Sequence, residues 1–137
     1  MKYDEKKCEE IESMNSEKPN KKYQDIEERT FNFAIQVIKF INQLSPCTAT
    51  FELSKQLISS ATSINSNIVQ ARSGISKKDF TNHMRIARKE AKETKRWIQM
   101  ITASGLANQQ KTNPILDENE EIIRILVTIV KNAEKNK

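Results

Sequence analysis

Residues 76–103 read SKKDFTNHMRIARKEAKETKRWIQMITA, and this stretch decides the fold. Wound as an α-helix at roughly 100° per residue, it separates its basic residues from its apolar residues. The basic residues fall within an arc of about 120°. They are Lys77, Lys78, Arg85, Arg88, Lys89, Lys92, Lys95 and Arg96, which we call the basic ridge. The apolar residues fall in a separate arc of about 160°. They are Phe80, Met84, Ile86, Ala87, Ala91, Trp97, Ile98 and Ile101. The pattern predicts an amphipathic helix with one buried face.

The composition favours a single helical domain. The 137 residues include only two glycines and three prolines, which disfavours a strand-rich fold with many tight turns. The formal net charge is +5, and residues 76–104 carry eight basic and three acidic residues. No apolar run of the signal type begins the chain, and none approaches the roughly 18 residues of a membrane span. Two cysteines without CxxC spacing indicate reduced thiols. We therefore expect a soluble, cytoplasmic protein.

Three other segments show the same helical periodicity, with apolar residues every three or four positions. With the central stretch, the predicted helices cover about residues 26–44, 49–73, 76–103 and 114–134. Ser76 is the expected N-cap of the central helix. Asn113 followed by Pro114 predicts the start of the last helix, because Pro favours the first helical position. Gly74 is expected in the left-handed conformation that ends many helices.

Four amphipathic helices joined by short loops predict an all-α fold. The expected architecture is an antiparallel up-down-up-down four-helix bundle over residues 26–137. Residues 1–25 are dense in Lys, Glu, Asn and Ser and carry no sustained apolar stripe. We expect this segment to be a flexible polar leader.

Two sets of polar residues lie beside the apolar stripes. The first set is uncharged and follows one face of the second helix: Gln56, Ser60, Ser63, Asn67 and Gln70. Such a face is either weakly polar surface or is covered by another helix or another subunit. The second set is Glu90 and Glu93, which the helical wheel places near Trp97 rather than with the basic ridge. We interpret these carboxylates as polar anchors that accept hydrogen bonds from Gln56, Ser60 or Asn67, or from a neighbouring subunit.

Little in the sequence supports catalysis or metal binding. His83 is the only histidine, so one chain cannot supply a pair of histidine ligands. Neither cysteine lies near a histidine in sequence, and two glycines are too few for a P-loop or a dinucleotide fingerprint. Glu90 and Glu93 are a carboxylate pair of the kind that serves acid–base chemistry, but no Glu-x-x-His element accompanies them. We predict no enzyme activity, no metal and no cofactor.

The basic ridge has two interpretations. A charged helix face is usually only solvated surface. However, cations of the ridge stand four residues apart, as in Arg85/Lys89 and Lys92/Arg96, and such like-charged pairs destabilise a helix. A helix built only for solubility mixes both signs. We favour the binding of RNA or DNA through its phosphates, which is salt-sensitive and weakly sequence-specific.

Residues 29–100 resemble a known family. The segments RTFNFAIQVIKFI, QLISSATSINSNIVQARSGISKKDF and IARKEAKETKRWI are similar to the 23S rRNA intervening-sequence proteins, a four-helix-bundle group. The accessory protein of diversity-generating retroelements belongs to the same group. The run SATSINSNIVQARSGISKKDF, residues 60–80, is fairly specific to the family. Gln70 is a departure, because family members usually carry Glu there.

The resemblance implies a ring-shaped homo-oligomer, pentameric in known relatives, without established enzymatic activity. It also implies structural or interfacial roles for Ser60, Ser63, Asn67, Gln70, Glu90, Glu93 and Trp97. The retroelement relatives bind a reverse transcriptase and nucleic acid, so both are expected partners of this chain.

Our leading hypothesis is a non-enzymatic, homo-oligomeric protein that binds nucleic-acid backbone through the basic ridge. It would act within a ribonucleoprotein or as an accessory factor of a reverse transcriptase. One alternative is a protein–protein adaptor whose ridge docks an acidic partner without contacting nucleic acid. Another is an enzyme that uses Glu90 and Glu93.

Overall fold

The computed structural model describes residues 25–135, where the chain forms four α-helices and no strand. They are α2 (Ile26–Asn42), α3 (Thr48–Arg72), α4 (Lys77–Ala103) and α5 (Gln109–Lys135). The all-α prediction is confirmed for this part of the chain. Residues 1–24, which make up most of the predicted leader, lie outside the described residues. None of the four helices combines the length and the apolar character that a membrane span needs.

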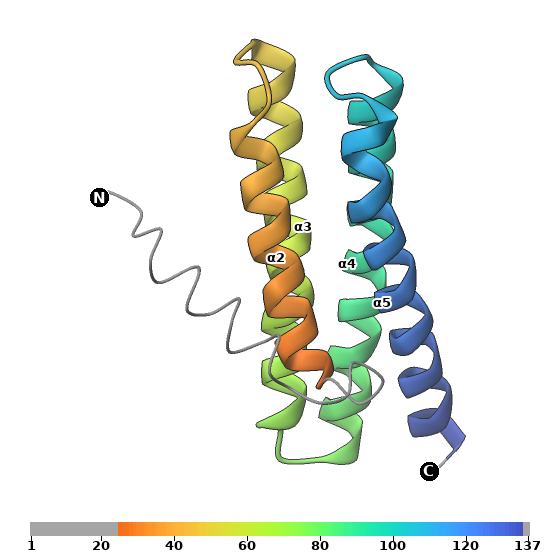
Figure 1. Cartoon of the computed structure of the whole chain (residues 1–137). Helices are drawn as coiled ribbons and strands as arrows, with labels where there is room; N and C mark the ends of the chain where they lie inside the picture. The colour runs from red at the N-terminus through yellow and green to blue at the C-terminus, as the bar shows by residue number, and fades with distance from the viewer. Residues whose placement is uncertain (1–24, 136–137) are drawn as a thin grey trace, which may run out of the picture.

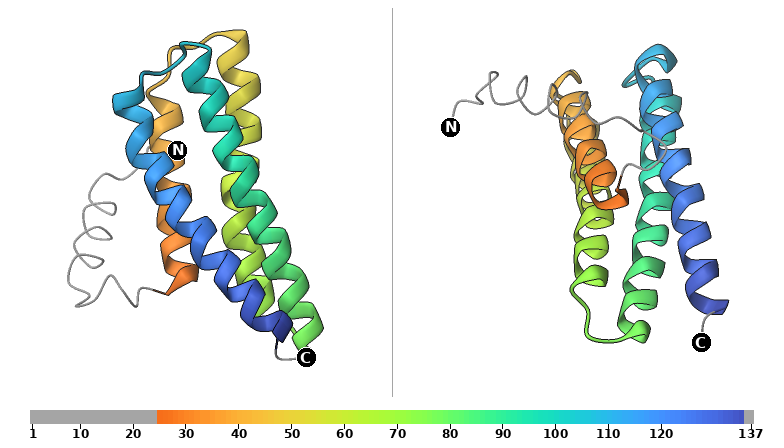
Figure 2. Two further views of the ribbon diagram at one scale, coloured as in Figure 1. Left: turned by 90° about the vertical axis from the view of Figure 1, so that its right-hand side faces the viewer. Right: turned by 60° about the horizontal axis from the view of Figure 1, so that its bottom comes forward.

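The helices form a bundle in which each helix packs against two others (Figure 1). α2 packs on α3, α3 on α4 and α4 on α5, and α5 also contacts α2. The turns that follow α2 and α4 lie at one end of the bundle, and the turn between α3 and α4 lies at the other (Figures 1 and 2). α4 therefore has a packing partner on each of two sides and solvent on the rest of its surface.

Apolar residues of all four helices meet in one core, and α4 supplies it at helical spacing. Met84, Ala87, Ala91, Ile98 and Ile101 are each at most 1% exposed. The prediction that this helix buries one apolar face is confirmed. The facing side chains of the other helices are Phe33, Val37, Phe40, Leu57, Ala61, Ile64, Ile68, Ile115, Ile122, Leu126 and Val130.

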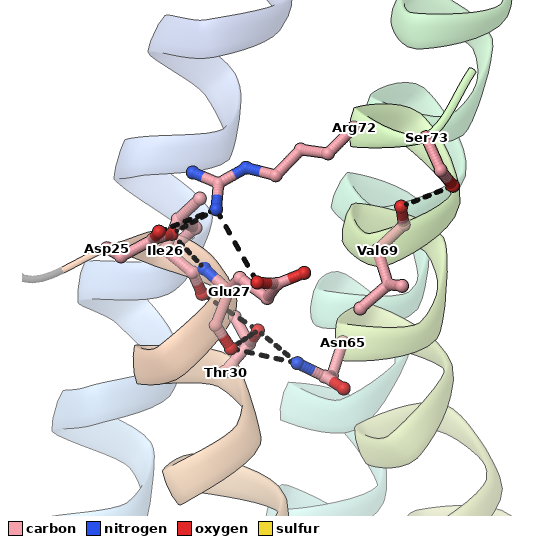
Figure 3. Close-up of polar contacts among 8 residues, drawn as sticks. All are labelled: Asp25, Ile26, Glu27, Thr30, Asn65, Val69, Arg72 and Ser73. Atoms are coloured by element: carbon pink, nitrogen blue, oxygen red, sulfur yellow. Dashed lines mark hydrogen bonds and ion pairs between the residues drawn. The ribbon is translucent and has the colours of Figure 1, made fainter.

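A polar cluster fixes the start of α2 against the end of α3 (Figure 3). The guanidinium of Arg72 donates to the Asp25 carboxylate at 2.6 Å and lies 3.7 Å from a Glu27 oxygen. About two turns earlier on α3, the Asn65 amide donates to the Glu27 carbonyl and to the Thr30 hydroxyl. The hydrogen bond to Asp25 raises the pKa of Arg72, so this cation is held by the fold.

The ends of α4 confirm the predicted cap at Ser76 and correct the expectation for Gly74. Ser76 is the N-cap of α4, where its hydroxyl accepts the Asp79 N–H at 3.1 Å. Gly74 is not left-handed; the glycine with positive φ is Gly105, at 80°, just after α4.

The last helix begins at Gln109, earlier than the predicted start at Pro114. Asn108 supplies the cap that we assigned to Asn113, because its side chain and its carbonyl both accept the Lys111 N–H. Pro114 consequently lies inside α5, where its missing N–H cannot bond the Gln110 carbonyl one turn earlier.

Candidate nucleic-acid interface

The basic ridge lies on α4 beside α5. Two of its cations contact that helix: Arg85 pairs with Glu134 at 2.9 Å, and Lys95 pairs with Glu120. Both pairs lie at the rim of the helix contact, and all four side chains are between 35% and 43% exposed. Ion pairs this exposed add little stability, but they set the local charge.

Six cations of the ridge have no ion-pair or hydrogen-bond partner among residues 25–135. They are Lys77, Lys78, Arg88, Lys89, Lys92 and Arg96. All are exposed except Arg88, which is half-buried. Packing of the bundle therefore leaves most of the ridge facing solvent with its charge unneutralised by neighbours. Because these cations share one helix face, their fields add in the solvent beside it.

Comparison with known proteins places the chain in a family. Residues 22–128 match the family model for 23S rRNA-intervening sequence proteins. The chain belongs to this family. No curated protein matches it. Among solved structures, the chain is similar to a protein with unknown function from the S23 ribosomal protein family of Bacteroides thetaiotaomicron VPI-5482. The two are 30% identical, with a TM-score of 0.70 over 78% of this chain and 99% of the other. Neither match indicates an enzymatic family.

The polar row on α3 of this intervening-sequence protein is divided between the bundle and its surface. Ser60 is buried, accepts the Thr94 hydroxyl of α4 at 2.8 Å and donates to the Leu57 carbonyl. Asn67 donates to Ser63 and lies 3.2 Å from the His83 ring through its amide oxygen. Both residues thus link α3 and α4.

The remaining members of the row, Gln56 and Gln70, are exposed. Among the described residues, the Gln70 side chain bonds only Ser66 of its own helix. Part of the row is therefore covered within one chain, and part is surface.

Glu90 and Glu93 do not receive the expected hydrogen bonds. Within residues 25–135, no hydrogen bond joins either side chain to Gln56, Ser60 or Asn67. Ser60 donates to the Leu57 carbonyl instead, and Asn67 donates to Ser63. Burial, and then the nearby charge of Glu93, raises the pKa of Glu90, while Lys89 opposes the shift. The prediction that Glu90 and Glu93 accept hydrogen bonds from Gln56, Ser60 or Asn67 of the same chain is therefore wrong. That they accept hydrogen bonds from a neighbouring subunit stays a prediction.

Two apolar residues on this side of α4 also differ from expectation. Ile86 is 42% exposed and Trp97 is half-buried, although both belong to the predicted buried arc. Met100 is 43% exposed as well. Ile86, Glu90, Glu93, Trp97 and Met100 lie on one face of α4, which we call the outer α3/α4 side. This side thus combines exposed apolar residues with carboxylates that lack partners in the described chain.

The structure adds buried polar residues that the sequence analysis did not select. Asn119 is fully buried, and its amide donates to the Ala91 carbonyl of α4 at 3.2 Å. Thr94 is also fully buried and donates to Ser60. The spacing held a signal for Asn119, because it stands four residues after Ile115 and three before Ile122, at a core position.

A pocket of about 450 Å³ lies at the turn from α4 to α5, with Gln99, Asn108 and Thr112 among its lining residues. Its lining includes no ionisable side chain and neither Glu90 nor Glu93. No cluster of three or more potential metal ligands occurs within the described ranges. The pocket and the carboxylates are thus separate features, and no acid–base pair faces this cavity.

Proposed function

We propose that this protein binds the phosphate backbone of RNA or DNA through the basic ridge and has no enzymatic activity. The observation that carries the proposal is the set of six ridge cations without partners in residues 25–135. Three like-charged pairs stand four residues apart, Arg85/Lys89, Arg88/Lys92 and Lys92/Arg96. Each such pair destabilises a helix by about 0.2–0.5 kcal/mol. The fold gains nothing from that repulsion, whereas a polyanion neutralises it.

We further propose that the chain is an up-down-up-down four-helix bundle and one subunit of a ring-shaped homo-oligomer. The family resemblance implies that this ring is a pentamer. Ile86 and Met100 expose apolar surface on the same face of α4 as the half-buried Glu90, which supports the proposal that another subunit covers this face. Each subunit would bring one ridge, so weak phosphate contacts would gain avidity. A reverse transcriptase within a ribonucleoprotein is the protein partner that the resemblance suggests.

A titration of labelled structured RNA, followed by fluorescence anisotropy, tests the proposal. At about 50 mM salt we expect binding, and at about 200 mM a loss of affinity on the order of 10³-fold. The ridge variant is Lys89→Glu with Lys92→Glu, because both lysines are exposed and neither has an ion-pair partner in the part of the chain that the structure describes. Arg85 is left intact, since its pair with Glu134 joins α4 to α5.

The matched control is Lys55→Glu with Lys111→Glu, which makes the same charge change at exposed lysines on α3 and at the start of α5. We expect the ridge variant to lose binding and the control to retain most of it. Equal losses would show that only net charge matters. If wild type does not bind at low salt, the proposal fails, and the adaptor alternative, with an acidic protein surface on the ridge, takes its place.

A further inference from the structure

The six unpartnered ridge cations form two groups along α4. Lys77 and Lys78 stand in its first turn. The second group follows after a gap and consists of Arg88, Lys89, Lys92 and Arg96. At about 1.5 Å per residue, roughly 15 Å of helix separates Lys78 from Arg88. The ridge is therefore not a uniform line of positive charge.

Between the two groups α4 carries one cation, Arg85, and that cation is paired. Arg85 is held by Glu134 of α5 through both Nε, at 3.1 Å, and Nη2, at 2.9 Å. Its remaining nitrogen, Nη1, donates to Asn82 at 3.3 Å. Thr81 is buried and bonds the Lys77 carbonyl. The centre of the ridge thus has a closed ion pair and no available cation.

No aromatic platform accompanies the ridge in the part of the chain that the structure describes. The exposed aromatic residues there are Phe31 on α2 and Phe51 on α3, which are different helices. The aromatic residues of α4, Phe80 and Trp97, are partly buried and pack on the core. Proteins that bind single strands rely on base stacking worth about 1–3 kcal/mol per base. The ridge offers charge without stacking.

We propose that the ridge takes a double helix rather than a single strand, with each cation group on one of the two phosphate rows that border a groove. This inference rests on the proposed function and narrows its ligand. The major groove of B-DNA is about 12 Å wide, which fits within the roughly 15 Å between the groups. The wide, shallow minor groove of A-form RNA presents two phosphate rows in a similar way. The Arg85–Glu134 pair then lies over the groove, where no phosphate needs a cation.

A competition assay tests this inference with a 20-base-pair RNA duplex, the corresponding DNA duplex and the single strands of each, at one salt concentration. We expect the duplexes to bind at least tenfold more tightly than the single strands. The Lys77→Gln, Lys78→Gln variant should bind the duplexes less tightly, and its salt slope should be shallower by about two phosphate contacts. If the protein binds the RNA duplex more tightly than the DNA duplex, it recognises the A-form groove. If it binds both duplexes with equal affinity, it recognises only the two phosphate rows.

Glu134→Gln provides a second readout, because it releases Arg85 into the gap. We expect single strands to gain more affinity than duplexes, so the preference for duplexes narrows. Glu121→Gln is the matched control, since Glu121 pairs with Arg124 of its own helix rather than with α4. This control should leave the preference unchanged.

The outcomes separate the two claims. If single strands bind wild type as tightly as duplexes, the inference is overturned and the proposed function stands. If the duplex preference survives Lys77→Gln, Lys78→Gln unchanged, the two-group arrangement is wrong. If no nucleic acid binds, the proposed function fails and the inference falls with it.

Discussion

The two sides of α4 hold their neighbouring helices by different means. Toward α3 the polar contacts are hydrogen bonds without an ion pair: the Thr94 hydroxyl donates to Ser60, and the His83 ring lies 3.2 Å from the Asn67 amide oxygen. Toward α5 there is one buried hydrogen bond, from the Asn119 amide to the Ala91 carbonyl, and the rim adds ion pairs from Arg85 to Glu134 and from Lys95 to Glu120.

The difference follows from solvent. Thr94 and Ser60 are at most 2% exposed, whereas the ionic side chains are more than a third exposed. Buried hydrogen bonds are expensive to leave unmade, while exposed ion pairs contribute little. The apolar core and the neutral contacts therefore hold α4 in place. The positive charge of the ridge is not needed for that purpose, which is why we assign it to a ligand.

The largest expected effect comes from the buried face of α4. Ile98 is fully buried, so Ile98→Ala should lower the free energy of unfolding by about 2–5 kcal/mol. Ile86→Ala makes the same chemical change at a residue that is 42% exposed in the single subunit. At protein concentrations where the subunit is monomeric, it should change the free energy of unfolding by less than about 0.5 kcal/mol. Urea unfolding followed by circular dichroism measures both. A large effect of Ile86→Ala that appears only at higher concentrations would mean that another subunit covers this side.

The next largest difference is expected between a contact of α4 with α3 and a contact of α4 with α5, measured as the loss in the free energy of unfolding when each is removed. Thr94→Val removes a buried hydroxyl that bonds Ser60, and we expect a loss of about 1–2 kcal/mol in the free energy of unfolding. Glu134→Gln breaks the exposed pair with Arg85, and we expect a loss of less than about 1 kcal/mol. The same unfolding experiment compares them, with added salt reducing only the second effect. The reverse order would contradict our account of what holds α4.

A smaller effect concerns pH and the outer α3/α4 side. The raised pKa of Glu90 means that the native state keeps its proton at a pH where the unfolded chain has released it. Stability from this group therefore falls as the pH rises from the ordinary carboxyl pKa through the raised value. Above this window Glu90→Gln should have a slightly higher Tm than wild type, and the difference should vanish below it.

Glu93→Gln is the control for this pH effect, because it removes the neighbouring charge but keeps Glu90. This variant should narrow the pH range over which ionisation of Glu90 lowers stability, but the range should not disappear. Thermal unfolding from about pH 3.5 to 7.5 measures all three proteins. A Tm difference that does not vary with pH would mean that ionisation of Glu90 is not its source.

The helical periodicity of α4 was sufficient to predict its buried face and the common face of the basic ridge, and the residue type at Ser76 was sufficient to predict its cap. The periodicity was not sufficient for Ile86 and Trp97, because a wheel shows which residues are apolar but not how far a neighbouring helix extends over them. The partners of Arg85 and Lys95 depend on the register between α4 and α5. A single helix contains no information about that register.

The start of α5 was mispredicted for a local reason. Asn108 and Asn113 are both good caps, and Pro114 favours the second. The structure uses Asn108, and the helix from Gln109 adds a turn in which Thr112 is fully buried. That burial outweighs the hydrogen bond lost at Pro114. The residue types at a helix start show the local preference for a cap, but they do not show how much burial in the bundle a longer helix gains.

The most direct test of the central claim is lysine footprinting. The protein would be acetylated with and without a saturating RNA duplex, and modification read by mass spectrometry at each lysine. We predict protection of Lys77, Lys78, Lys89 and Lys92, while Lys55 on α3, whose side chain is 74% exposed, reacts equally in both samples. Protection of Lys55 with an unprotected ridge would place the nucleic acid elsewhere and would contradict the account.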